Sequence, residues 1–266
     1  QESYVHAVLE RYGMQDCKPV ISPMVQASDL MSKSPRSDSE ASRMAGVPYR
    51  EAIGSLLYLA VRTRPEIAVA VSKLSKHVQE PKPCHWEGVK RVFSYLKGTA
   101  SHGLCYTATE QDPALKIFCD ADWATDPEDR HSRSGVVCYL GNSLVAWTSR
   151  RQATPSVSSC EAEYIALFEA GRDAVWMRSL LCELDMCPVS VPTKIIHDNQ
   201  GSIAWAQGCL RKVKHVELKY HHTQHLIESG QIRIAYVESA MNAADVMTQA
   251  LSGQSFHRAL EMLSIA

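Results

Sequence analysis

The sequence predicts an α/β fold, in which a mainly helical segment precedes a mixed five-stranded sheet with flanking helices. Residues 49–97 repeat apolar side chains at helical spacing only, whereas short apolar runs that end at carboxylates begin at residue 115. From there the predicted order is β-β-β-α-β-α-(α)-β-α, which is typical of a mixed sheet with helices on its faces. With 266 residues, 45% of them hydrophobic, the chain is long enough to bury such a core.

The composition excludes several classes of protein. The 28 basic and 29 acidic residues nearly cancel, so the chain is not a bulk polycation, and any nucleic acid would have to bind to local patches. Nine cysteines without a C-x-x-C pair favour a reducing compartment. The sequence contains neither an apolar stretch of about 18 residues nor a signal-peptide pattern, so we expect no membrane association and a cytosolic or nuclear protein. Because Gln1 opens a helical pattern, we also expect a piece of a longer polypeptide.

The first hundred residues are predicted to be helical, apart from one linker. Residues 4–13 have an amphipathic pattern, whereas residues 16–48 are rich in Ser and Pro and lose all periodicity. Helices are then expected at residues 49–61, 66–77 and 85–96. Basic residues on the third of these helices are interpreted as a solvated face.

The strands follow after residue 115. Strands are predicted at 115–120, 135–140, 144–149, 193–197 and 231–237, with a tight hairpin at Gly141-Asn142-Ser143. An S-x-x-E capping box at Ser158 to Glu161 opens a long helix that runs to about Leu184. Further helices are expected at 200–207, at 216–228 and from about Ala243 onward.

Four acidic residues are expected at the same edge of the predicted sheet. They are Asp120 at the end of the first strand, Glu163 early in the long helix, Asp198 after the fourth strand, and Asp245 at the start of the last helix. One crossover helix separates the first and fourth strands, so right-handed connection allows them to be parallel neighbours with adjacent carboxyl ends. A set of hard oxygen donors without paired Cys or His selects Mg²⁺ or Mn²⁺. Two such ions about 3.5–4 Å apart are suited to phosphodiester hydrolysis, which indicates a nuclease.

Each acid also has a plainer interpretation. Asp120 fits a turn, Asp198 fits a helix cap, and Asp245 fits an acid that is favoured by the helix dipole. Glu161 is the better candidate for capping, which leaves Glu163 for a metal. The convergence of all four acids favours the metal site.

Several long motifs in order, CDADWATDPEDRHSRSG, SSCEAEYIAL, HDNQGSIAWA and NAADVMTQAL, resemble the ribonuclease H domain of copia-type LTR retrotransposon Pol polyproteins. Upstream, YREAIGSLLYLAVRTRPEIAVAVSKLS resembles the segment that joins this family's reverse transcriptase to its ribonuclease H. The resemblance covers essentially the whole chain. It implies a ribonuclease H-like fold, and it places the family's metal-binding acids on Asp120, Glu163, Asp198 and Asp245.

The resemblance also implies a function. The family's domain hydrolyses the RNA strand of RNA/DNA hybrids during reverse transcription, using two Mg²⁺ or Mn²⁺ ions. The implied partners are the hybrid and the remainder of the reverse transcriptase and Pol polyprotein. The implied locations are virus-like particles in the cytoplasm, and the nucleus. No Tyr-x-Asp-Asp motif occurs, so we expect no polymerase active site in this chain.

On this basis the expected domain boundaries follow. Residues 1–48 would be the end of the reverse transcriptase and the linker, 49–110 the helical connection, 111–255 the ribonuclease H-like domain, and 256–266 a tail. Three positions depart from the family pattern, because His197 replaces a frequent Cys, Cys160 a Thr and Gln249 a Lys. None of these changes removes a predicted metal ligand.

Candidate nucleic-acid contacts are basic or polar residues near the predicted site. They are Asn199, Gln200, Arg150, Arg151, Lys212, Lys214 and His215. The basic residues would bind phosphates, with a plain solvated face as the alternative, while Asn199 and Gln200 are candidates for contacts to 2'-hydroxyls. The helical His221 and His225 are interpreted as surface residues and not as a second metal site.

Two other functions compete with the nuclease. A catalytically silent remnant that binds nucleic acid or other proteins would explain the scaffold, although the intact acids argue against decay. A different nuclease on the same fold, such as a resolvase or an integrase, is disfavoured by the NAAD segment and by the copia-like upstream region.

Overall fold

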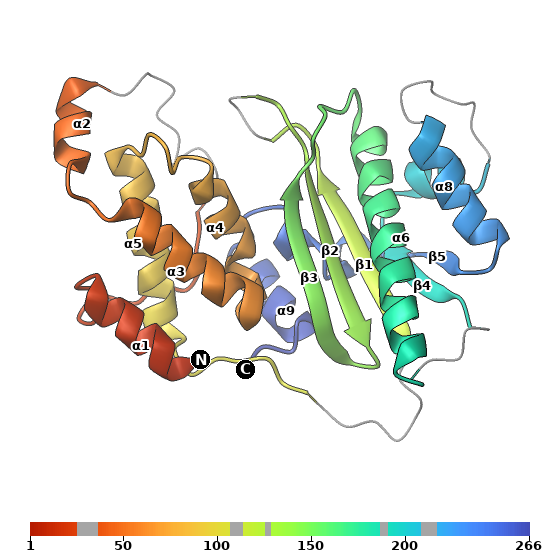
Figure 1. Ribbon diagram of the computed structural model, residues 1–266, viewed down its shortest axis with the longest axis horizontal. Helices are drawn as coiled ribbons and strands as arrows, with labels where there is room; N and C mark the ends of the chain where they lie inside the picture. Colours follow the sequence, from red (N-terminus) through yellow and green to blue (C-terminus); the bar gives the residue numbers. More distant parts are fainter. Residues whose placement is uncertain (26–36, 107–113, 126–128, 187–190, 209–216) are drawn as a thin grey trace. The chain divides into compact units, whose positions relative to one another are not determined.

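The computed structural model describes residues 1–25, 37–106, 114–125, 129–186, 191–208 and 217–266 (Figure 1). The chain forms two compact units. One comprises Gln1–Cys105 together with Gln249–Ala266, and the other comprises Tyr106–Thr248. The four-part division expected from the sequence stays a prediction, but the grouping of residues 249–266 with the first unit was not foreseen.

The first unit is helical. Its elements are α1 (Glu2–Arg11), α2 (Asp38–Met44), α3 (Tyr49–Arg62), η2 (Pro65–Ile67), α4 (Ala68–Ser75), α5 (Pro83–Gly98) and α9 (Gly253–Met262). Apolar residues at helical spacing make its core, and Phe256 of α9 packs edge-on against Tyr95 of α5 with 5.8 Å between ring centroids. A short bridge between Leu104 and Ile265 also joins the two ends of this unit. None of the described helices is both long and apolar enough to cross a bilayer.

A buried ion pair lies inside the helical unit. The Arg64 Nε donates to Glu66 Oε1 at 2.7 Å, and both side chains are at most 1% exposed. Arg64 also donates to the carbonyl and to the hydroxyl oxygen of Thr99, at 3.0 and 2.6 Å. These hydrogen bonds satisfy the guanidinium, as burial of a charge requires.

Helix α2 corrects the expectation that residues 16–48 lack regular structure. Ser37 accepts from the Glu40 backbone N–H at 3.3 Å, and Glu40 Oε2 accepts from the Ser37 N–H at 2.9 Å. This reciprocal capping box satisfies two backbone donors and starts the helix. The S-x-x-E signal was present in the sequence but was obscured by the surrounding Ser and Pro residues.

The second unit contains the predicted five-stranded mixed sheet, in the order β3-β2-β1-β4-β5. The strands are β1 (Leu115–Asp122), β2 (Arg133–Leu140), β3 (Ser143–Arg151), β4 (Thr193–His197) and β5 (Ile232–Tyr236). The first three pair antiparallel, and β1, β4 and β5 pair parallel. The predicted hairpin is confirmed, because Gly141 adopts a φ of 63° between β2 and β3.

Helix α6 (Ser159–Glu183) packs along β1, β2 and β4, with α7 (Gln200–Ala206) and α8 (Glu217–Glu228) beside it (Figure 1). Ser158 caps α6 by accepting from the Glu161 N–H, as expected, while the Glu161 carboxylate accepts from Val157 N–H. The core between helix and sheet includes Ile117, Ile195 and the pair Tyr164–Trp205, whose ring centroids are 4.7 Å apart. This core fixes α6 against the two central parallel strands.

The end of the second unit differs from the predicted helix that starts at about Ala243. Two 3₁₀ turns, η4 (Ser239–Met241) and η5 (Asp245–Met247), stand there, and the next α-helix is α9. The Asn242 side chain explains the turn, because its Oδ1 accepts from the Ala244 N–H at 3.1 Å. A side chain that binds its own backbone in this way competes with continuous helix.

Candidate metal centre

Each of the four predicted acids is positioned by a different element. Asp120 is the sixth residue of β1, two short of the end, where the sequence had predicted the last residue. Asp198 directly follows β4, the parallel neighbour of β1, so the two carboxylates lie at the same edge of the sheet. Glu163 lies in the second turn of α6, and Asp245 opens η5.

These acids converge. Carboxylate oxygens of Asp120, Asp198 and Asp245 all lie within 4.8 Å of one another. Glu163 offers an oxygen within the same distance of Asp198 and of His197. The parallel pairing of β1 and β4 brings Asp120 and Asp198 together, as the sequence argument expected, and the roles of all four residues stay predictions.

Burial and mutual repulsion make the fully ionised cluster unfavourable. Burial raises the pKa of Asp120 to about 6, with further increase from Asp198 and a lowering by the Thr248 hydrogen bond. Burial, Asp120 and Asp198 together raise the pKa of Glu163 to about 9. The pKa of Asp245 rises to about 8 for the same reasons. A cation bound here would reverse these shifts, because it stabilises the charged carboxylates.

Two oxygens at this site have no hydrogen-bond partner among the described residues. They are Glu163 Oε2 and Asp198 Oδ1, and both are buried. Buried carboxylate oxygens normally accept hydrogen bonds or coordinate a metal. The buried acidic cluster therefore fits a divalent metal ion, and its all-oxygen donor set fits a hard one.

His197 lies beside the cluster but is not available as a metal ligand. Its Nδ1 is 3.1 Å from the Cys119 carbonyl oxygen, and its Nε2 is 2.6 Å from Ser202 Oγ. Burial lowers the pKa of His197, which favours the neutral ring. Both ring nitrogens are thus engaged, so the four carboxylates remain the candidate ligands.

Sequence reasoning missed three residues that support the acids. Thr248 donates its hydroxyl proton to Asp120 Oδ2. Asn242 Nδ2 donates to the Cys119 carbonyl at 3.0 Å, which ties the η4–η5 segment to β1. Gly135 pairs with Asp120 across β1 and β2, where a Cβ would collide with η5. In the sequence, only the N-A-A-D spacing gave a signal for any of these three residues.

The predicted nucleic-acid contacts receive no test from this geometry, and they stay predictions. Arg151 forms an ion pair with Asp129 at 2.6 Å, and the charge of Arg150 opposes the burial-driven rise in the pKa of Glu169. Asn199 caps α7 by accepting from the Ser202 N–H at 2.9 Å, and Gln200 is exposed beside it. Lys212, Lys214 and His215 lie outside the described residues.

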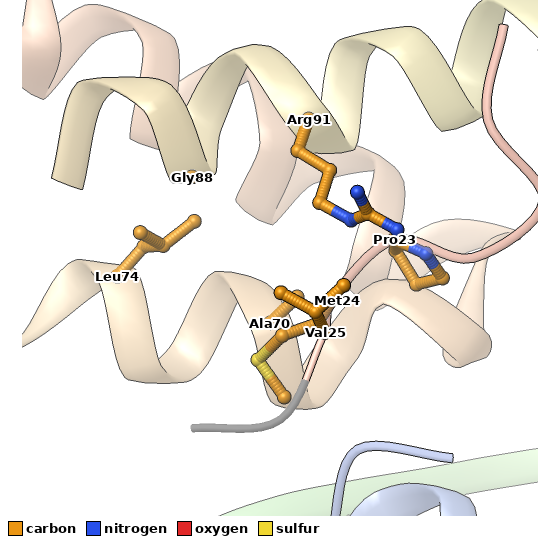
Figure 2. A pocket seen from close by; sticks show the side chains of 7 residues that line it. All are labelled: Pro23, Met24, Val25, Ala70, Leu74, Gly88 and Arg91. Carbon is orange, nitrogen blue, oxygen red and sulfur yellow. The ribbon is translucent and has the colours of Figure 1, made fainter. Parts of the chain in front are cut away.

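A small pocket in the helical unit has different chemistry. Pro23, Met24, Val25, Ala70, Leu74, Gly88 and Arg91 line it (Figure 2). The Arg91 guanidinium is directed towards Pro23 and donates to Ser22 Oγ at 3.3 Å. The lining contains no carboxylate, so this pocket is not a candidate metal centre.

Comparison with known proteins identifies the family, although no family model matches the chain. The chain is 33% identical over 268 residues to the retrovirus-related Pol polyprotein from transposon TNT 1-94 of Nicotiana tabacum, and the match covers 100% of this chain. It is 33% identical over 270 residues to that from transposon RE2 of Arabidopsis thaliana. This chain belongs to the Pol polyproteins of copia-type retrotransposons. It spans 20% and 18% of the length of these two relatives.

The sheet of this chain has three antiparallel strands followed by two parallel ones, with helices on its flanks, as the sequence predicted. Among solved structures, the N-terminal RNase H domain of a Mycobacterium tuberculosis protein is 17% identical, with a TM-score of 0.39. That match covers 56% of this chain and 97% of the other. The two curated relatives confirm the predicted family, and the strand order of the chain itself confirms the predicted mixed five-stranded sheet with flanking helices.

Proposed function

We propose that this chain hydrolyses the RNA strand of RNA/DNA hybrids, with two divalent cations, Mg²⁺ or Mn²⁺, held by Asp120, Glu163, Asp198 and Asp245. The observation that carries the proposal is the convergence of four carboxylates, which include two buried oxygens without a partner among the described residues. Such a set is unfavourable without cations and well suited to hold them. Membership of the Pol family supports the hybrid as the substrate.

The protein's own groups would prepare the site. Thr248 holds one oxygen of Asp120 by a hydrogen bond, while Glu163 and Asp198 each keep a buried oxygen without a hydrogen-bond partner among the described residues. When bound, the ions supply a water-derived nucleophile and stabilise the leaving oxygen of the phosphodiester. The expected products carry 3'-hydroxyl and 5'-phosphate ends.

The proposal extends to partners and location. The remainder of the reverse transcriptase would deliver the hybrid, and Arg150 and Gln200 are exposed residues that are available to contact it. The proposed locations are virus-like particles in the cytoplasm, and the nucleus. Discrimination of RNA from DNA would use 2'-hydroxyl contacts in the minor groove.

A cleavage assay with a matched control tests the function. Asp198→Asn keeps the shape of the side chain but removes a ligand charge, so we expect hybrid cleavage in Mg²⁺ to fall to background. Asp185→Asn makes the same change at an exposed position after α6, where a φ of 54° suits Asn, and should cleave like the wild type. DNA duplex should remain intact with all three proteins.

The silent remnant is the second candidate, and the same assay separates the two. A wild-type chain that binds Mn²⁺ but leaves the hybrid uncut would support the remnant. Equal cleavage by the wild type and Asp198→Asn would refute the proposed metal site, because the activity would then arise elsewhere.

A further inference from the structure

One backbone oxygen joins the segments that carry the acids. The Cys119 carbonyl oxygen accepts from His197 Nδ1 at 3.1 Å and from Asn242 Nδ2 at 3.0 Å. Cys119 precedes one metal-site acid in β1, His197 precedes another at the end of β4, and Asn242 lies three residues before the acid of η5. Three separate parts of the chain are therefore tied together within one to three residues of the carboxylates.

The contact with the Cys119 carbonyl oxygen indicates which nitrogen of His197 carries a proton. A carbonyl oxygen only accepts, so the Nδ1 that faces it must donate. In the neutral ring, Nε2 is then an acceptor. The Ser202 hydroxyl lies 2.6 Å from Nε2 and 2.9 Å from the Asn199 carbonyl oxygen, and in this arrangement it directs its single proton to Nε2. The Cys119 thiol, 3.4 Å from Nδ1, cannot donate to a nitrogen that already carries hydrogen.

We propose that His197 is a positioning residue, whose Nδ1–H···O=C hydrogen bond to Cys119 holds Asp120 and Asp198 at ion-binding spacing before an ion arrives. The inference rests on the proposed function only in that the acids bind metal. His197 is fully buried, and its ring spans from β1 to Ser202 on α7, so it fixes the end of β4 on both sides. Groups that orient metal ligands in this way tune metal affinity.

The protonated nitrogen can be observed directly. A long-range ¹H–¹⁵N spectrum of the metal-free chain, with the His197 signal assigned by comparison with the spectrum of His197→Asn, reports which ring nitrogen carries hydrogen. We expect a proton on Nδ1. An Nδ1 without a proton would overturn the proposal, because it could not donate to the carbonyl.

Two amide substitutions separate the two sides of the ring. In His197→Asn the amide occupies the position of Nδ1 and can still donate to Cys119, whereas in His197→Gln it occupies the position of Nε2 and loses that bond. Mn²⁺ affinity is measured by electron paramagnetic resonance titration. We expect His197→Gln to bind Mn²⁺ about 10–100-fold more weakly than wild type, and His197→Asn to stay within about threefold.

Ser202→Ala is the matched control, because it removes the partner of Nε2 and leaves the Nδ1 bond intact. It should bind Mn²⁺ like the wild type. If His197→Gln does not fold, the ¹H–¹⁵N spectrum of the wild type still tests the proposal, because the proposed bond to Cys119 requires a proton on Nδ1. Loss of affinity in Ser202→Ala and His197→Asn alike, or wild-type affinity in a folded His197→Gln, would overturn it.

The outcomes are separate from those of the proposed function. A wild-type chain that binds Mn²⁺ without cutting the hybrid contradicts the nuclease and leaves the positioning role testable by affinity alone. A wild-type chain that cuts the hybrid while a folded His197→Gln binds Mn²⁺ equally well contradicts the positioning role only.

Discussion

Replacing Gly135 with Ala should push η5 away from the sheet and so loosen the metal centre. Gly135 pairs with Asp120 across β1 and β2. An added Cβ would lie 2.7 Å from Met247 Cβ, 2.8 Å from the Ala244 carbonyl oxygen and 2.8 Å from Thr248 Cγ2. Because favourable carbon contacts are about 3.5–4 Å, η5 would have to shift by up to about 1 Å.

The expected cost is that of overpacking a well-packed region, about 1–3 kcal/mol of unfolding free energy. For a unit of this size that corresponds to a melting temperature lower by roughly 3–10 °C. The shift would also move Asp245, which opens η5, and Thr248, which donates to Asp120. We therefore expect weaker Mn²⁺ binding together with lower stability.

Tryptophan fluorescence during thermal unfolding measures the stability, because four of the five tryptophans, at positions 123, 147, 176 and 205, belong to the sheet unit. Gly54→Ala is the control. Gly54 lies on the exposed side of α3, where an added Cβ meets no atom within 4 Å. The Gly54→Ala substitution should leave the thermal unfolding of the sheet unit unchanged and stabilise the helical unit by about 0.5–1 kcal/mol.

An unchanged melting temperature and unchanged Mn²⁺ affinity in Gly135→Ala would refute the reasoning, because they would mean that η5 does not press on β2. Lower stability with unchanged affinity would refute only the link between η5 and the metal centre.

Three further predictions concern charge. Burial raises the pKa values of three site carboxyls to between about 6 and about 9 in the folded chain, compared with pKa values near 4 in the unfolded chain. Their neutral forms therefore stabilise the folded state. This stabilisation is fully present below about pH 4 and is lost as the pH rises through 6 to 9. The melting temperature of the metal-free sheet unit should therefore fall between pH 6 and 9, and Mg²⁺ should raise it more at pH 9 than at pH 6; the opposite trend would contradict the charge argument. Thr248→Val removes the hydrogen bond that lowers the pKa of Asp120, so Mn²⁺ affinity should drop more at pH 6 than at pH 8 in paired titrations, and an equal drop would contradict this role. Arg64→Met leaves Glu66 charged and buried without its cation, which should destabilise the helical unit by about 3–5 kcal/mol in circular dichroism melts, whereas adding Glu66→Gln should restore most of the loss.

The sequence predicted what depends on local patterns and on the direction of strands. Apolar runs at 115–120 and 193–197 placed two parallel strands side by side, with Asp198 directly after one strand and Asp120 near the end of the other. The S-x-x-E signal at Ser158 correctly gave the start of α6. These features depend on neighbouring residues and on connection rules, both of which a sequence displays.

Contacts between distant residues were not predictable in the same way. The Asn242 side chain bonds its own backbone and also Cys119, which is 123 positions earlier, so a turn replaces the expected helix. Helix α9 belongs to the helical unit because Phe256 packs against Tyr95, and no local sequence pattern indicates that Tyr95 is its partner. The same holds for His197, because its polarity alone gives no indication of the two groups that satisfy its ring.

The two outer strands of the sheet bear on how the chain behaves in solution. β5 has only five residues and carries Arg233, while β3 ends in Arg150 and Arg151 and meets β2 through an irregular register at Cys138 and Tyr139. Edge strands that are short, charged or irregular discourage another chain from adding a strand to the sheet. Substituting Arg233 with an apolar residue would remove one such safeguard, so self-association into fibre-like aggregates should increase.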